Sequence, residues 1–129
     1  AEDINGQRYT EESDAECIDV PIAVLVNDST YSAAEYFAET LREFGRATVV
    51  GQQTTGKGYY QQVFYLSDGS AINLSTMKYF TPDGTCLAGV GITPDVPVDI
   101  SDEEYVGVYL GTLTHGEDTQ LQAAVESVK

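Results

Sequence analysis

The strongest constraint on the fold is a strand–helix–strand pattern between residues 22 and 50. Residues 22–26 form a continuous apolar run of strand length, which is typical of a strand that is buried on both faces of a sheet. A turn rich in capping residues follows, and then a helix is predicted from about residue 31 to residue 44. Residues 47–50 are predicted to form a second buried strand. Three such elements within about 30 residues predict a βαβ unit and an α/β fold.

One face of the expected helix is apolar. Ala33, Phe37, Leu41 and Phe44 recur at helical spacing, and an amphipathic helix usually turns such a face toward the core. Gly45 follows at the position where a helix often ends.

Outside the strand–helix–strand unit, the sequence predicts a hairpin, an irregular N-terminal segment and a helical C-terminal segment. Residues 61–66 and 71–80 are predicted strands, joined by a turn at residues 67–70. Residues 1–19 are polar and aperiodic, and they predict an acidic lead-in loop. Residues 20–100 are the expected core, and residues 101–129 the expected short helical tail. Its last helix is expected to begin near Asp118 and to bury Leu121, Ala124 and Val125.

Composition excludes several functions. The chain has 21 acidic and 6 basic residues, a net charge of −15, which disfavours contact with nucleic acid or with an anionic membrane. No apolar run approaches the roughly 20 residues of a membrane helix, and no signal-like leader opens the sequence. With one histidine and two cysteines 69 positions apart, a Cys/His zinc cluster is not expected. Whether the two cysteines pair stays open.

Two alternative sites have weak support. Residues 51–57 match the first seven positions of a phosphate-binding P-loop, but Gly58 replaces the required Ser or Thr. Such a loop should also open a helix, whereas the residues after it predict a strand. His115 could act as the base of a Ser-His-Asp triad, but its polar surroundings predict an exposed loop residue.

Ser32 and Lys57 are candidates for nucleophilic chemistry. Ser32 lies in the first turn of the helix after a buried strand, where open α/β sheets place their sites, and the amide of Ala33 could stabilise an oxyanion. Alternatively, Ser32 caps the helix together with Glu35. Lys57 lies between two glycines that permit close backbone approach. It could serve as a general base or be a surface lysine, and the residues alone leave both pairs of alternatives open.

Five short motifs occur in a fixed order between residues 21 and 98. They are Pro21-Ile-Ala-Val-Leu-Val-Asn27, Thr30-Tyr-Ser-Ala-Ala-Glu35, Thr55-Gly-Lys-Gly58, Tyr79-Phe-Thr-Pro-Asp-Gly84 and Gly91-Ile-Thr-Pro-Asp95. In order and spacing they resemble the C-terminal processing (tail-specific) peptidases, a family of serine-lysine proteases.

The resemblance implies a Clp-protease/crotonase-like core, with a mixed sheet and helices packed on it. It implies that Ser32 is the nucleophile, that Lys57 is the general base, and that Gln61 orients the lysine. The N–H of Ala33 would be one oxyanion donor. No metal or organic cofactor is expected.

The family also implies a substrate and a location. Its members cut proteins or peptides that carry an apolar C-terminal tail, often bound by a PDZ domain, and they usually work outside the bacterial cytoplasm. We expect this chain to be the C-terminal part of such a protease domain, without the PDZ domain and without a Gly-Gly segment that supplies a second oxyanion amide. Alone, it is expected to be inactive and to pair with a second copy through an exposed sheet edge.

The sequence departs from the family pattern beside the nucleophile. Tyr31 stands where the family often has alanine, and its ring is expected to narrow the space next to Ser32. The alternative function is that of a non-catalytic relative that binds peptides or protein tails.

Overall fold

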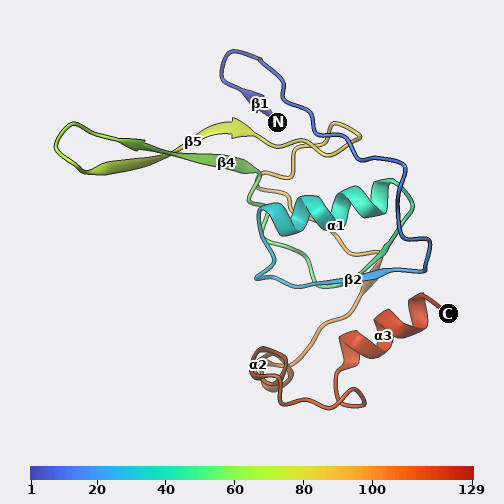
Figure 1. Cartoon of the computed structure of the whole chain (residues 1–129). Coiled ribbons are helices and arrows are strands. Elements are labelled where there is room, and N and C mark those ends of the chain that lie inside the picture. Colours follow the sequence, from blue (N-terminus) through green and yellow to red (C-terminus); the bar gives the residue numbers. More distant parts are fainter.

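A three-stranded parallel sheet organises the fold in the computed structural model, which describes residues 1–129 (Figure 1). Strands β2 (Ala23–Val26), β3 (Thr48–Gly51) and β6 (Val96–Pro97) lie in the order β2-β3-β6. Helix α1 (Ala33–Glu43) connects β2 to β3 on one side of this sheet, and α3 (Thr119–Ser127) packs on both strands from the other side. The predicted α/β class and βαβ unit are confirmed.

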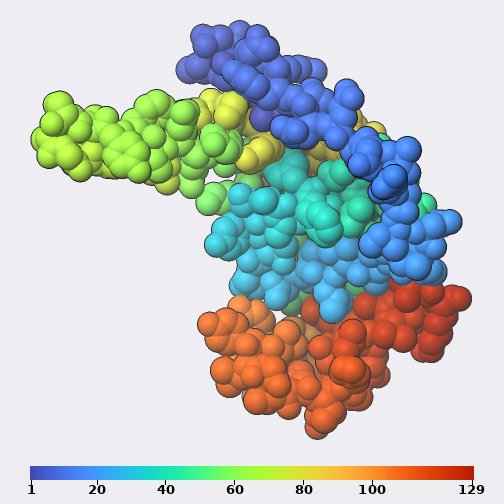
Figure 2. All heavy atoms as spheres, viewed as in Figure 1, coloured from blue at the N-terminus to red at the C-terminus, as the bar shows by residue number.

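A second, antiparallel sheet forms an arm. Strand β4 (Tyr59–Tyr65) pairs with β5 (Ala71–Lys78), and the two strands project from the body of the molecule (Figures 1 and 2). The short strand β1 (Glu2–Asp3) pairs with the end of β5. The sequence had predicted a loop throughout residues 1–19, and this prediction is wrong for β1. The sequence predicted a single mixed sheet, but parallel and antiparallel pairing occur in two separate sheets, because β4 and β5 pair with each other and with β1 away from the parallel strands.

The C-terminal residues form two short helices, α2 (Asp102–Leu110) and α3. Asp118 caps α3 by accepting a 2.8 Å hydrogen bond from the N–H of Leu121, so the predicted helix start is confirmed. Val125, which was expected to be buried, is 47% exposed. Gln120 points inward instead, because its amide donates to the carbonyl of Val98 at 2.9 Å. None of the three helices is long and apolar enough to cross a membrane.

Helix α1 turns a polar face toward the core, contrary to the sequence expectation. Phe37 and Phe44 are 64% and 63% exposed, while the buried residues of the helix are Glu35, Ala38 and Glu39. The buried acidic side chains are tolerated because their carboxylates accept hydrogen bonds.

The apolar core is small for a chain of this length. It consists of Val26, Ala38, Val49, Leu87 and Ile92. The chain exposes 8809 Å², against about 6,700 Å² for a compact monomer of 14.0 kDa.

Large apolar side chains are exposed on the projecting arm and on the outer face of α1. Strands β4 and β5 expose large apolar side chains along most of their length. On the parallel sheet, Leu25 in β2 is 42% exposed. The prediction that this strand is buried on both faces is therefore wrong.

Tyr36 attaches α1 to the segment between the two sheets. Its hydroxyl donates to the carbonyl of Tyr79 at 2.9 Å and accepts from the N–H of Leu87 at 3.1 Å. Burial raises the pKa of Tyr36 to about 12. The hydroxyl therefore keeps its proton, and this link between helix and loop, throughout the physiological pH range.

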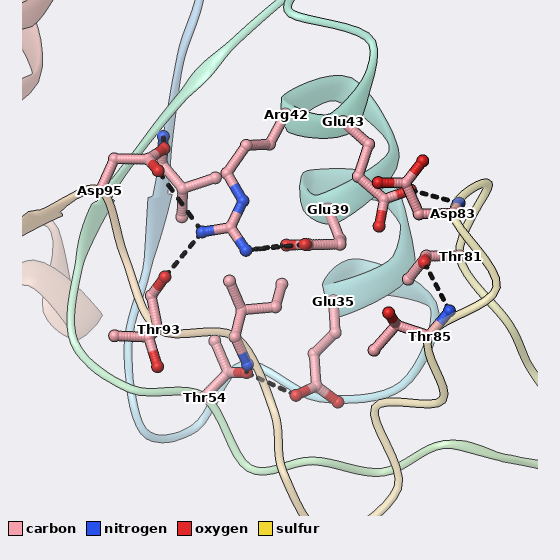
Figure 3. A network of polar contacts seen from close by, with 12 residues as sticks. Glu35, Glu39, Arg42, Glu43, Thr54, Thr81, Asp83, Thr85, Thr93 and Asp95 are labelled. Carbon is pink, nitrogen blue, oxygen red and sulfur yellow. Dashed lines mark hydrogen bonds and ion pairs between the residues drawn. The ribbon is translucent and has the colours of Figure 1, made fainter.

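Arg42 attaches the other end of α1 to the segment that leads into β6 (Figure 3). Its guanidinium donates to Glu39 Oε1 at 2.7 Å and to the carbonyl of Thr93 at 2.7 Å, and it lies 3.5 Å from Asp95 Oδ1. The other oxygen of Asp95 accepts from the N–H of Val49 at 2.9 Å. The network therefore joins the helix to the central strand.

We expect Arg42→Ala to lower the free energy of unfolding by about 1–3 kcal/mol, because it leaves the Glu39 carboxylate, 8% exposed, without its cation. The matched control is Arg8→Ala, which removes the exposed ion pair with Glu2 and should cost less than about 0.5 kcal/mol. Urea denaturation measures both. Equal losses in the two variants would contradict the structural role of Arg42.

Candidate active site

Ser32 lies at a strained turn between β2 and α1. It is the N-cap residue of the helix, with φ 60° and ψ −128°, and it is the only non-glycine residue with a positive φ. Such a conformation costs about 1–3 kcal/mol and persists only where the surroundings hold it. A strained strand-to-helix turn is also where α/β-hydrolases carry their nucleophilic serine.

A buried carboxylate holds Ser32 and Lys57 together through their backbones (Figure 3 shows its bond to Thr54). Glu35 is fully buried, and its Oε2 accepts from the N–H of Ser32 at 2.8 Å and from the N–H of Lys57 at 2.9 Å. Its Oε1 accepts from the N–H of Gly56 at 2.7 Å and from Thr54 Oγ1 at 2.5 Å. All four partners are donors, as an ionised carboxylate requires.

The capping alternative for Ser32 describes part of this geometry. Ser32 and Glu35 are arranged as a capping box, yet the serine hydroxyl makes no side-chain capping hydrogen bond of standard geometry. The hydroxyl can therefore serve another purpose. Ala33 is the first residue of α1, so its N–H has no acceptor within the helix.

Sequence reasoning treated Glu35 only as a capping partner and missed its link to the lysine loop. The Ser-x-x-Glu spacing was the available signal, but it predicts only the local half of the contacts. The bonds to Gly56 and Lys57 cross more than 20 positions of sequence, and no local pattern predicts them.

The two glycines beside Lys57 allow close backbone packing, as expected. A Cβ atom at Gly56 would lie 2.8 Å from the N atom of Gly91, and one at Gly58 would lie 2.4 Å from the N atom of Ala88. The backbone of the lysine loop is therefore held against the segment that follows the arm.

The side chains of the expected catalytic residues are not hydrogen-bonded to one another in this structure. Lys57 is half-buried, and its Nζ lies over the ring of Tyr31, 5.3 Å from the centroid; no hydrogen bond joins it to the Ser32 hydroxyl. Gln61 is exposed in β4. Residues four apart on one regular strand face the same side, but β4 begins at Tyr59, after Lys57, and its pairing register shifts directly before Gln61. Strand alternation therefore does not place Gln61 beside Lys57.

The alternative sites gain nothing from the structure. Residues 51–57 are followed by strand β4 and not by a helix, so the P-loop geometry is absent. His115 lines a shallow hollow beside α3 that includes neither Ser32 nor Lys57.

No group of three or more His, Cys, Asp or Glu residues is placed to hold a metal ion. Cys17 and Cys86 are free thiols.

The structure thus brings the backbones of Ser32 and Lys57 to one buried carboxylate on an α/β core. A family model described as peptidase family S41 matches residues 2–98. The chain belongs to peptidase family S41, and its fold is the Clp-protease/crotonase-like fold of the protease domains in that family.

Three relatives illustrate the similarity. The chain is 44% identical to a carboxy-terminal-processing protease of Bartonella bacilliformis over 79 residues, which are 61% of this chain and 18% of that protein. It is 38% identical over 99 residues to a "Probable CtpA-like serine protease" of Staphylococcus aureus, covering 77% of this chain and 20% of that protein. The solved photosystem II D1 C-terminal processing protease matches with a TM-score of 0.60 and 41% identity, over 63% of this chain and 21% of that one. The chain thus spans about a fifth of each relative.

Substitutions at Ser32 test the strained turn. We expect Ser32→Gly to be more stable than Ser32→Ala by about 1–2 kcal/mol, because glycine adopts a positive φ without a steric penalty. At Ser29, whose φ is not positive, the order should reverse, with alanine more stable by about 0.4–1 kcal/mol. Free energies of unfolding in urea measure all four variants. If alanine is at least as stable as glycine at position 32, the turn is not strained.

Removal of the Glu35 charge tests the carboxylate link. Glu35→Gln places an amide NH₂ where two N–H donors need an acceptor, and we expect it to cost about 1–3 kcal/mol of stability and to speed amide hydrogen exchange at Gly56 and Lys57. The control on the same helix is Glu43→Gln, because Glu43 accepts only the N–H of Asp83 in a site that water can reach. Equal costs and unchanged exchange would show that Glu35 does not hold the loop.

Proposed function

We propose that this chain carries the nucleophile and the general base of a serine endopeptidase that cuts proteins near their C-termini. The observation that carries the proposal is the Glu35 carboxylate, one oxygen of which accepts from the backbone of both Ser32 and Lys57. A buried anion in this position keeps the two residues in the same part of the molecule. The protease names of the relatives support the same function.

In the proposed acylation step, the neutral amine of Lys57 takes the hydroxyl proton of Ser32 while Oγ attacks the carbonyl carbon of the peptide. The carbonyl oxygen becomes an oxyanion, and the N–H of Ala33 donates to it at the start of α1, where the helix dipole favours negative charge. The lysine then gives its proton to the departing amine. The serine is left as an ester.

In the proposed deacylation step, Lys57 takes a proton from a water molecule, and the water oxygen attacks the ester. The ester bond breaks, the Ser32 hydroxyl is restored, and the new C-terminal carboxylate leaves. Gln61 would orient the lysine by accepting a hydrogen bond from its amine. This role requires the lysine side chain to leave its present position over Tyr31.

We further propose that the substrate is a protein or peptide with an apolar C-terminal tail and that the parent protein works outside the bacterial cytoplasm. Both proposals come from the family to which the chain belongs. The net charge of −15 disfavours acidic polymers as substrates, which agrees with a preference for apolar tails.

Cleavage by the full-length parent protein tests the mechanism. An unstructured protein with an apolar C-terminal tail is offered to the wild type, to Ser32→Ala and to Lys57→Ala, with Lys78→Ala in β5 as the control for a lysine outside the site. We expect each dyad variant to lose at least about 10³-fold in kcat/KM, whereas Lys78→Ala keeps the wild-type rate. Circular dichroism checks that every variant is folded.

Two results would contradict parts of this function. Efficient cleavage by folded Lys57→Ala would mean that another group is the base. A wild type that binds the tail but never cuts it would support the alternative, a non-catalytic module that binds protein tails.

A further inference from the structure

We propose that Tyr31 is a positioning residue for Lys57, whose ring holds the lysine ammonium away from the Ser32 hydroxyl while no substrate is bound. The consequence for catalysis rests on the proposed function, but the contact itself does not. Tyr31 directly precedes Ser32 in the sequence.

The first support is the environment of the lysine nitrogen. Nζ lies 5.3 Å from the centroid of the Tyr31 ring, inside the limit of about 6 Å for a cation–π interaction. Lys57 takes part in none of the five ion pairs of the structure, and its hydrogen bond to Glu35 uses the backbone N–H. The Tyr31 ring is therefore the interaction partner of the Lys57 nitrogen in this structure.

The second support is the rigidity of both backbones. Glu35 Oε2 fixes the N–H of Ser32, directly after Tyr31, and it fixes the N–H of Lys57 as well. The flanking Gly56 and Gly58 pack closely on neighbouring backbone. The ring and the lysine thus both extend from backbones that hydrogen bonds and close packing hold in place.

The physics of the contact opposes catalysis. The quadrupole of an aromatic ring attracts an ammonium ion, whereas a neutral amine has no charge to attract. The general base has to be neutral and has to face the hydroxyl. The ring therefore favours a direction of the lysine side chain that does not react, and over an exposed ring such as that of Tyr31 this preference is worth about two- to fivefold.

Binding of the substrate would release Lys57 from the Tyr31 ring. Tyr31 is 56% exposed, and it is adjacent in sequence to the residue that must reach the scissile carbonyl. A peptide chain lying across Ser32 would contact the ring, and displacement of the ring would free Lys57. The proposed arrangement thus keeps the base away from the nucleophile until a peptide arrives.

The contact is tested by NMR of the full-length protein with ¹³Cε-labelled lysine, in which Lys57→Arg identifies the Lys57 signal. We expect the ε-methylene protons of Lys57 to show an upfield ring-current shift. Tyr31→Phe should retain the shift because it keeps the ring, and Tyr31→Leu should lose it because it keeps bulk without a π-system. A Lys57 signal at the free-lysine position in the wild type would overturn the proposal.

The consequence is tested with diisopropyl fluorophosphate, a probe too small to need a tail-binding site. Ser32 Oγ forms a bond to phosphorus, the phosphorus–fluorine bond breaks, and the serine proton passes to Lys57 as fluoride leaves. We expect Tyr31→Leu to react about two- to fivefold faster than the wild type, and we expect no such gain in Tyr31→Phe. A slower Tyr31→Leu, or the same gain in both variants, would overturn the holding role.

The two readouts separate this proposal from the function on which it rests. If the probe never labels Ser32, while the ring-current shift is present and depends on the ring, the contact stands and the proposed serine chemistry falls. If Ser32 is labelled and the shift is absent, the chemistry stands and the role of Tyr31 falls.

Discussion

The carboxylate of Glu35 is the interaction on which the site depends. Burying a carboxylate costs several kcal/mol unless hydrogen bonds replace its water. Here four donors do so, and they come from the helix start and from residues 54–57. Thr54 also accepts from the N–H of Ile92 at 2.7 Å. The turn at Ser32, the lysine loop and the segment before β6 therefore hold their shapes together, because each supplies a group that the buried charge or its partner needs.

The same requirement explains why α1 faces inward with its polar side. Glu35, Glu39 and Arg42 recur at helical spacing: Glu35 and Arg42 bind segments outside the helix, and Glu39 pairs with Arg42. Once these polar residues point inward, Phe37 and Phe44 must point outward. Together with the apolar arm, they leave large apolar side chains exposed on a chain whose surface exceeds that of a compact monomer of this mass. This open architecture agrees with a chain that spans about a fifth of its relatives.

Local patterns predicted the elements better than their orientations. The order of strands and helix from residue 22 to residue 51, the hairpin and the start of α3 were all predicted, because each has a period or a capping signal of its own. The buried face of α1 was predicted wrongly, because an apolar period does not reveal that polar partners lie on the other side. Gln61 shows a similar limit: alternation along a strand relates two residues only if the strand is regular and includes both.

The sequence by itself determined the α/β class, the family and the choice of Ser32 and Lys57 as candidates, since these follow from local periodicity and from short motifs in order. Only the tertiary structure decided that Glu35 joins the two candidates, that Ser32 has a strained backbone, and that the Lys57 amine lies over Tyr31. These features depend on contacts between segments more than 20 positions apart. Such contacts arise when a buried charge, a close glycine packing and an aromatic ring are satisfied together, and no window along the chain contains all of the partners.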